Sequence, residues 1–451
     1  MTEYLTERNL EVTVTGNGAN LISELESGVL RQLAPNENPV RLAVTSSDGG
    51  RWQCDVGVLV SGSPQESIFR YRQRTVEDQS KFNVVMLVPT GIGAEIGGHA
   101  GDATPAATVL ASVCDTLITH PNVLNAADII QVPANALYVE GSVVASLLMG
   151  NVGLNPVRSN RVLTVVQRRD DRLFTDAAIN AVNAARATYG LTSSEIVEID
   201  PEFRMTAEYS SSGAAVGRVD GIHTLWDILD TRLGDFDAIA VSSVIDVPTH
   251  WHRDYYEAGG RMVNPWGGVE AMLTHAISSR YGVPAAHSPM LESREVADLD
   301  LGVVDPRMAA EVVSVTFLQC ILRGLQFSPK LVPPAAGVAR FGVESVSCLV
   351  IPEGCLGLPT LAALGQGIPV IAVAENKNIM RNALEDLPWR PGQYFPVANY
   401  WEAAGVVAAL RVGVDPASIR RFPGLKDSFS TTSGEPVASE TGRETRLPPY
   451  R

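Results

Sequence analysis

The stretch NVVMLVPTGIGAEIGGHAGDATP, residues 83–105, decides the fold class of this chain. It begins with an apolar, β-branched run, passes through five glycines and ends at Thr104 and Pro105, which suit the N-cap and the first position of a helix. A buried strand, a loop and a helix in this order form the repeating unit of a parallel sheet. The stretch therefore predicts an α/β protein.

The same alternation of short apolar runs and amphipathic stretches continues along the chain. It predicts mainly parallel sheets built from Rossmann-like βα units. The predicted strands are TLIT (116–119), LYVEG (137–141), RVLTVVQ (161–167), AIAVSSVI (238–245), CLVIP (348–352) and VIAVAEN (370–376). Residues 10–60 differ, because EVTVTG, RLAVTSS and WQCDVGVLV are spaced like an antiparallel meander.

Changes in composition suggest a domain division. SPKLVPPAAG (328–337) has three prolines and is typical of a linker. The run from Ser428 to Arg451 has few apolar residues and predicts disorder. We expect two lobes, divided as a β-rich N-terminal segment (1–80), a main α/β domain with the glycine-rich loop (81–330), a smaller Rossmann-like βαβ lobe (331–420) and a disordered tail (421–451).

Charge and composition exclude several function classes. Lys and Arg number 35 against 50 Asp and Glu, and the resulting charge of −15 repels nucleic-acid backbones. The first ten residues, MTEYLTERNL, lack the basic region followed by an apolar region that is typical of a signal peptide. No apolar run is long enough for a membrane span. The five cysteines show no CxxC spacing, which predicts free thiols. We expect a cytoplasmic protein and, for this size and class, a homodimer.

The glycine-rich loop is the first candidate binding site. Backbone N–H groups at a helix N-terminus favour an anion, so Thr90, Gly91, Gly93, Gly97 and Gly98 are candidates for holding an acidic group. The spacing matches neither GxGxxG nor GxxxxGK, so we predict no dinucleotide cofactor and no redox chemistry. Glu95 and Asp102 would repel an anion, which leaves a cationic group or a tightly packed turn as alternatives.

Polar residues follow several of the predicted strands. The carboxyl ends of parallel strands share one edge of a sheet, where ligands bind. Each residue could instead serve only as a cap or a hydrogen-bond partner within the fold. The candidates are His120, Asn122, Glu140, Ser242, Ser243, His287, Glu353, Glu375 and Asn376.

Cys355 in PEGCLGLP is the candidate nucleophile, because it precedes a predicted helix whose N-terminus would stabilise a thiolate. The layout is similar to the second cysteine motif of the aspartate and glutamate racemase superfamily, but a matching first motif is absent. The alternative is a small buried apolar residue. GLPTLAALGQGIPVIAVAEN (357–376) also resembles the donor domain of two-Rossmann glycosyltransferases.

The segment THWHRDYYEAGGRMVNPWGG (249–268) is rich in aromatic residues and arginines. Its composition fits a lid over a small-molecule pocket, a partner surface or a plain loop. His250 and His252 could bind zinc if they shared one face of a strand.

Three segments in a fixed order resemble a known family: TGIGAEIGGHAGDATPAATVLASVCDTLITHPNVLNAADI, LYVEG and VIPEGCLGLPTLAALGQGIPVIAVAEN. Residues 81–380 are similar to the uncharacterised family catalogued as domain of unknown function 3326. The family implies no activity. The resemblance implies that a shared site would use Thr90, Gly91, Gly93, Gly97, Gly98, Asp102, His120, Asn122, Asn125 and Glu140. His99, usually a tyrosine in that family, and the His250–His252 pair fall outside the pattern.

These features together predict a hydrolase, lyase or isomerase acting on a small polar or anionic metabolite. His120 would be the acid or base, with His287 as a possible partner, while Cys355 or Glu353 would approach from the other lobe. Glu140 and Asn122 would position the substrate, and no cofactor is predicted. The rival hypotheses are a glycosyltransferase-like enzyme using a nucleotide sugar, a hydrolase dependent on a divalent metal, and a non-catalytic metabolite-binding protein.

Overall fold

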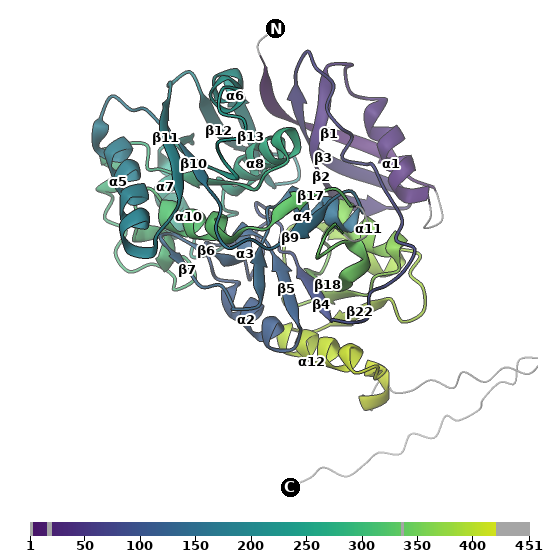
Figure 1. Cartoon of the computed structure of the whole chain (residues 1–451). Helices are drawn as coiled ribbons and strands as arrows, with labels where there is room; N and C mark the ends of the chain where they lie inside the picture. The colour runs from purple at the N-terminus through teal and green to yellow at the C-terminus, as the bar shows by residue number, and fades with distance from the viewer. Residues whose placement is uncertain (1–2, 16–19, 335–337, 421–451) are drawn as a thin grey trace, which may run out of the picture.

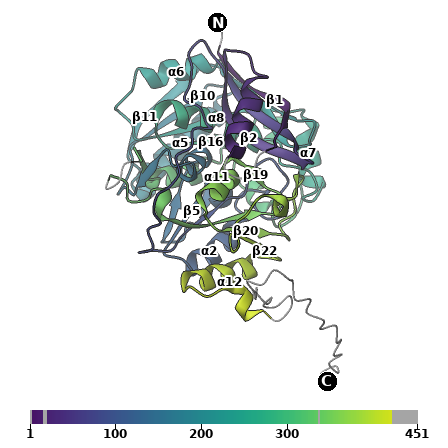
Figure 2. The same ribbon diagram turned by 90° about the vertical axis from the view of Figure 1, so that its right-hand side faces the viewer.

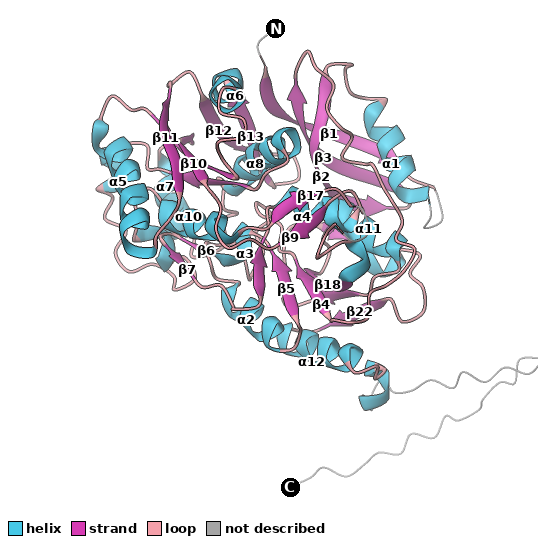
Figure 3. Ribbon diagram, viewed as in Figure 1, coloured by secondary structure: helices cyan, strands magenta, loops and turns pink. Residues whose placement is uncertain are grey.

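The computed structural model describes residues 3–15, 20–334 and 338–420. Three large sheets with helices packed between and around them form the molecule, as Figures 1 and 3 show. Two of these sheets are parallel, and the third contains the N-terminal strands. The predicted α/β class with a β-rich N-terminal segment is therefore confirmed. The predicted tail, 421–451, lies outside the described residues.

A six-stranded parallel sheet forms one part of the core. In space its strands run β8 (Ala136–Tyr138), β5 (Thr116–Thr119), β4 (Asn83–Met86), β18 (Val346–Pro352), β20 (Val370–Val373) and β22 (Tyr394–Val397). Numbered along the chain, this order is 3-2-1-4-5-6, the order of a Rossmann sheet. Its central strands β4, β18 and β20 are wholly buried, as the apolar runs predict.

Two pairs of helices pack against this sheet. α2 (Thr104–Ser112) and α12 (Tyr400–Arg411) pack together, and so do α4 (Gly141–Leu148) and α11 (Leu358–Gln366). Figure 2 shows α12 at the end of the molecule that lies away from β1 and the N-terminus. Covering helices explain why strands with no polar face are stable in this sheet.

The segment 331–420, predicted as a smaller separate lobe, is built into this same sheet. Its strand β18 pairs in parallel with β4, with Cys348 opposite Val84. Without β18, strand β4 would form an open, apolar edge of the sheet. Pairing with β18 covers this edge. At β18 the chain therefore returns to a sheet that began at residue 83.

A four-stranded parallel sheet lies in the long segment between the two halves. Its order is β11 (Ser193–Ile199), β10 (Val162–Gln167), β14 (Ala238–Ser243) and β16 (Ala285–Pro289). α5 (Arg172–Tyr189) and α10 (Leu318–Phe327) pack together against it. Two of the predicted apolar runs form β10 and β14, and both strands are buried on both faces.

The third sheet is largely antiparallel and gathers strands from three parts of the chain. Its core is β1 (Tyr4–Thr13), β3 (Arg51–Val60) and β2 (Glu37–Asp48), with α1 (Leu21–Leu30) between β1 and β2 in sequence. The other strands are β12 (Arg204–Tyr209), β13 (Ala215–Asp220), β15 (Ile245–Asp246), β19 (Leu356–Gly357) and β21 (Arg381–Asn382). The N-terminal segment is thus part of a sheet completed by later residues.

Helix α8 (Gly267–Tyr281) lies at the centre of the molecule in Figure 1. It packs against β13 and β2 of the antiparallel sheet, against β16 of the four-stranded sheet and against α4. The remaining elements are short: α3 (Pro121–Leu124), β6 (Asn125–Ala126), β7 (Ile129–Ile130), β9 (Gly153–Asn155), α6 (Ile222–Asp230), α7 (His250–Glu257), α9 (Arg294–Ala297) and β17 (Lys330–Val332). None of the helices in the described ranges has the length and apolarity that a membrane crossing needs.

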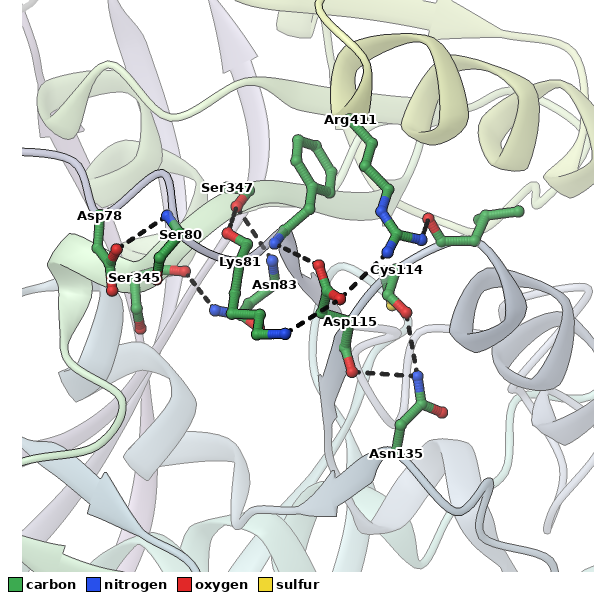
Figure 4. Close-up of polar contacts among 12 residues, drawn as sticks. Asp78, Ser80, Lys81, Asn83, Cys114, Asp115, Asn135, Ser345, Ser347 and Arg411 are labelled. Carbon is green, nitrogen blue, oxygen red and sulfur yellow. Dashed lines mark hydrogen bonds and ion pairs between the residues drawn. The ribbon is translucent and has the colours of Figure 1, made fainter.

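The amino edge of the six-stranded sheet is fastened by polar contacts, drawn in Figure 4. Asp115 accepts a hydrogen bond of 2.8 Å from the backbone N–H of Phe82 and forms ion pairs with Arg411 of α12 and with Lys81. The buried side chain of Asn83 donates to the carbonyl of Ser345. These contacts join β4, β5, β18 and α12 at one end of the sheet.

Candidate functional site

A cavity of about 890 Å³ lies at the opposite, carboxyl edge of the six-stranded sheet. Residues that follow β4, β5, β8 and β18 border it, and so do α8 and the segment after β16. In a sheet of order 3-2-1-4-5-6, ligands bind where the order reverses, here between β4 and β18. The topology thus places the cavity where a binding site is expected.

The cavity brings together residues that are distant in the sequence. Of the candidates from the sequence, it is bordered by Thr90, His120, Asn122, Asn125, Glu140, His287 and Cys355. The residues that border it do not include Ser242, Ser243, Gly91, Gly93, Gly97, Gly98, Asp102, Glu353, Glu375 and Asn376 within the described part of the chain. Five of the seven histidines, at 99, 120, 252, 275 and 287, line this one cavity.

Several N–H groups of the glycine-rich loop donate to protein groups. The carboxylate of Asp102 accepts from the N–H of Gly97 at 2.8 Å and of His99 at 3.4 Å. Glu311 accepts from Ala100 at 2.7 Å, and Asn376 accepts from Ile96. An external anion at these four N–H groups would have to displace these partners, which counts against the predicted anion site.

The glycines serve close packing instead. Gly97 has φ of 91°, and a Cβ there would lie 2.6 Å from the side chain of Val88. A Cβ on Gly98 would collide with the carbonyl of Ala94. A Cβ on Gly91 would press on Ala215 at about 3 Å. The alternative of a tightly packed turn, which the sequence left open, explains these positions.

Two asparagines that were candidates for substrate binding hold this loop in place. The side chain of Asn122 donates to the carbonyls of Val88 and Gly97. The fully buried Asn376 donates to the carbonyl of Ile96 and to Tyr400. Glu353 accepts from Tyr394, and Glu375 is exposed. The cavity wall therefore does not include Asn376, Glu353 or Glu375.

His120 is buried at the cavity wall, and its Nε2 accepts a 3.0 Å hydrogen bond from the backbone N–H of Val88. An accepting Nε2 places the proton of the neutral ring on Nδ1. Burial, with a smaller contribution from the nearby His275, lowers the pKa of His120 to about 4. No described residue hydrogen bonds to Nδ1. At neutral pH, His120 can therefore offer an N–H to a ligand, but its basic nitrogen is already engaged.

Glu140 is the N-cap of α4 and is tied down by protein contacts. One carboxylate oxygen accepts from the N–H groups of Ser142 and Val143 and from the Ser142 hydroxyl. The other accepts from Thr274 at 3.1 Å and lies 3.3 Å from Nε2 of His275. Glu140 therefore links α4 to α8 and orients His275, in addition to bordering the cavity.

His287 connects a buried hydroxyl to an open carboxylate. Its Nε2 lies 2.9 Å from the hydroxyl of Ser243, and its Nδ1 lies 2.9 Å from Oε1 of Glu270. The His287 ring is fully buried, whereas the Glu270 side chain is 25% exposed and borders the cavity. With Nδ1 donating to the carboxylate, Nε2 accepts from Ser243. The pair fixes Glu270, so His287 positions that carboxylate and does not itself face a ligand.

Cys355 borders the cavity but lacks the features of a thiolate. α11 begins three residues later, at Leu358, and the Cys355 side chain is buried. Burial raises the pKa of this thiol, and the neighbouring Glu353 raises it further. The predicted activation by a helix N-terminus is therefore not found, and the thiol is protonated at neutral pH. All five cysteines are free and buried, as the spacing predicted.

A further acidic group lies at the end of the glycine-rich loop. Glu311 is 8% exposed and borders the cavity, and burial raises its pKa to about 7. Nearby, Nδ1 of His99 lies 2.6 Å from the hydroxyl of Tyr255, which also contacts Asn264. Burial lowers the pKa of His99 to about 4. Burial thus favours the neutral form of both groups.

The cavity is strongly acidic. It is bordered by one Arg or Lys side chain within the described residues, Arg41, whose guanidinium pairs with the buried Glu7 at 3.3 Å. Burial raises the pKa of Glu7 to about 7, against the opposing effect of Arg41. The carboxylates at the wall are Glu66, Glu140, Glu270, Glu292, Asp300 and Glu311.

The histidine pair predicted as a zinc alternative does not share a face. α7 is helical from His250 to Glu257, and positions i and i+2 of a helix point about 200° apart. His250 is exposed and His252 is buried. No group of three or more His, Cys, Asp or Glu is arranged for a metal among the residues that the structure describes.

Sequence reasoning missed the contribution of α8. Glu270, Thr274 and Ser278 recur every four residues and face the cavity together with His275. Val269, Met272, Leu273, Ala276 and Ile277 of the same helix are buried in the core. A polar stripe at i, i+4 and i+8 in an otherwise apolar helix was the available signal.

Comparisons with known proteins agree on a group without an established function. The family model described as "Protein of unknown function (DUF3326)" matches residues 83–420. An uncharacterized lipoprotein from Synechococcus sp. is 36% identical over 369 residues, which cover 78% of this chain and 98% of that protein. Lipoprotein describes that relative, and the cytoplasmic location and homodimer expected for this chain stay predictions.

Proposed function

Since the chain belongs to the family of proteins of unknown function DUF3326, we infer its function from the site and propose an acid–base enzyme that acts on a small polar metabolite. The observation that carries this proposal is the chain Ser243–His287–Glu270, which holds one carboxylate open to the cavity. Burying a histidine and a serine to orient a single carboxylate is typical of a catalytic site.

Glu270 would act as the base. A carboxylate in a largely enclosed cavity can remove a proton from a carbon next to a carbonyl group. His120 would supply the complementary hydrogen-bond donor. Its ring is neutral, and its Nδ1–H would donate to the carbonyl oxygen of the substrate. The C–H electron pair would form a carbon–carbon double bond as the carbonyl π electrons move to that oxygen, while Glu270 holds the proton.

Two outcomes complete such a reaction. Glu270 can return the proton to a neighbouring carbon, which gives an isomerase, or the enolate can expel a leaving group, which gives a lyase. Neither route needs a redox partner. Both use the groups in this cavity better than hydrolysis through a nucleophile, because Cys355 is protonated and the described cavity wall does not include Ser243.

A nucleotide sugar is a less suitable ligand for this cavity. A diphosphate needs several donors or cations. The loop N–H groups are taken by Asp102, Glu311 and Asn376, and Arg41 is paired with Glu7. The glycosyltransferase-like alternative therefore has no specific contact in its favour.

Proton exchange in heavy water tests the proposal. A thermal-shift screen first selects carbonyl metabolites, since a ligand at a hundredfold excess over its Kd stabilises by about 2.7 kcal/mol. Proton NMR in D2O then follows loss of the C–H signal next to the carbonyl. We expect enzyme-dependent exchange that Glu270→Gln removes. If compounds stabilise the protein but keep their proton and are recovered unchanged, the result would favour a binding protein over an enzyme.

A further inference from the structure

His252 of α7 has no part in the chemistry proposed above, yet it borders the cavity. Its side chain is only 9% exposed, and its Nε2 has no hydrogen-bond partner among the described residues. A buried polar atom without a partner costs free energy, so such atoms in native proteins usually await a water or a ligand. His252 is therefore a candidate contact for a bound molecule.

Glu292, which follows β16, faces the same position. Its Oε1 lies 3.6 Å from Nε2 of His252, which is too long for a direct hydrogen bond. No described residue donates a hydrogen bond to this carboxylate, although Arg169 donates to the backbone carbonyl of Glu292 at 2.9 Å. A single group with two N–H donors could bridge both acceptors.

An aromatic wall stands beside these acceptors. The ring of Trp266 lies 5.5 Å from the ring of His252, and Trp266 and Tyr256 both border the cavity. The face of a tryptophan ring attracts a cation. The cavity wall holds six carboxylates in the described residues against Arg41, which is already paired. Charge, aromatic surface and unfilled acceptors all suit the same kind of group.

We propose that Glu292, His252 and Trp266 form a subsite for a cationic nitrogen of the substrate, in the form of a protonated amine. Glu292 supplies the opposite charge, and Nε2 of His252 accepts one N–H. The ring of Trp266 covers the ammonium. This inference rests on the proposed function, because the amine belongs to the molecule whose proton Glu270 removes.

Matched pairs of amines and alcohols test the subsite. The probes are glucosamine with glucose, ethanolamine with ethylene glycol, and alanine with lactate, so that each pair differs by one amino group. Isothermal titration with the full chain is expected to show the amine of at least one pair binding about tenfold more tightly than its alcohol, since a hydrogen bond to a charged group has that effect.

Variants separate the subsite from general charge. Glu292→Gln and His252→Phe should each remove the preference for the amine, while His252→Phe keeps the aromatic packing. Glu295→Gln is the control, because it removes an exposed carboxylate three residues away and should change nothing. Equal binding of amine and alcohol in every pair, no binding of any amine, or unchanged preference in Glu292→Gln overturns the inference.

The same experiment distinguishes failure of the subsite from failure of the proposed function. Proton exchange by the enzyme without any preference for amines would overturn the subsite alone. Amines that bind through Glu292 but never exchange a proton in D2O would overturn the enzymatic proposal and keep the subsite.

Discussion

The two edges of the six-stranded sheet use polar residues in opposite ways. At the amino edge, Asp115 is partly exposed and pairs with Arg411 and Lys81. The pKa of Asp115 is lowered, and the hydrogen bond from the backbone of Phe82 is the largest cause. At the carboxyl edge, burial raises the pKa of Glu311 and lowers the pKa of His120. The amino edge keeps Asp115 charged and paired, whereas burial at the carboxyl edge favours the neutral forms of Glu311 and His120.

This difference supports the carboxyl edge as the proposed binding site. At the amino edge, Asp115 and the side-chain amide N–H of Asn83 hydrogen bond to neighbouring segments and stabilise the fold directly, although Oδ1 of Asn83 has no partner among the residues that the structure describes. At the carboxyl edge, buried titratable groups and unfilled acceptors cost stability in the free protein. Such a cost is typical of functional sites, where the groups are arranged for another molecule.

The largest expected effect concerns the base. Glu270→Gln should lower the rate of proton exchange by a factor on the order of 10² to 10⁴, because the proton acceptor is lost. Asp115→Asn removes a carboxylate from the other edge and should leave the rate unchanged. NMR exchange rates measured on both variants, with folding checked by circular dichroism, compare the two edges. Equal losses in both variants would contradict the functional distinction between them.

The pH dependence of stability gives the next effect. Glu311 has a pKa raised to about 7 from its ordinary 4.5, so the folded chain keeps a proton that the unfolded chain loses between these values. Stability attributable to Glu311 is therefore present below pH 4.5 and is lost as the pH rises to about 7. Relative to the native protein, Glu311→Gln should gain on the order of 1 to 3 kcal/mol between pH 4.5 and 8.

Urea unfolding at a series of pH values measures this difference. Using the difference between variant and native protein removes the opposite contributions of His99 and His120, whose lowered pKa values favour folding as pH rises from 4 to 6.5. A gap between Glu311→Gln and the native protein that stays constant across this range would show that burial does not hold Glu311 protonated.

A smaller effect is expected from the amino edge. Asp115→Asn should destabilise the protein by about 1 kcal/mol, because the bond from Phe82 weakens and two partly exposed ion pairs are lost. The loss should shrink in high salt, which screens the ion pairs. Denaturant midpoints at low and high salt provide the measurement, and a salt-independent loss would assign the effect to the backbone hydrogen bond alone.

The smallest effect is expected at Cys355. Cys355→Ala should change the rate of proton exchange less than about twofold, because a buried, protonated thiol is a poor nucleophile. Native protein should also resist iodoacetamide at this position, as mass spectrometry of the labelled peptide can show. Rapid labelling together with a large loss of rate would restore the nucleophile that the sequence suggested.

Part of the site was predictable from strand ends alone. The periodic apolar runs place His120 and Glu140 after β5 and β8, and parallel pairing then brings them to one edge. The roles of these residues were not predictable in the same way. In the folded structure, the N–H of Val88 engages Nε2 of His120. The carboxylate of Asp102 engages the N–H of Gly97 in the loop. Neither contact can be read from local sequence patterns.

The sequence by itself determined the α/β class, a glycine-rich loop after β4 and the polar residues at strand ends, because these follow from local spacing and burial. Only the tertiary structure decided that Asn83 and Ser347, 264 residues apart, belong to neighbouring strands of one sheet. It also decided that Asp102 occupies the loop and that α8 supplies Glu270 to the cavity. Local patterns specify which elements form, but contacts between distant segments set the partners, charges and exposure that give a site its chemistry.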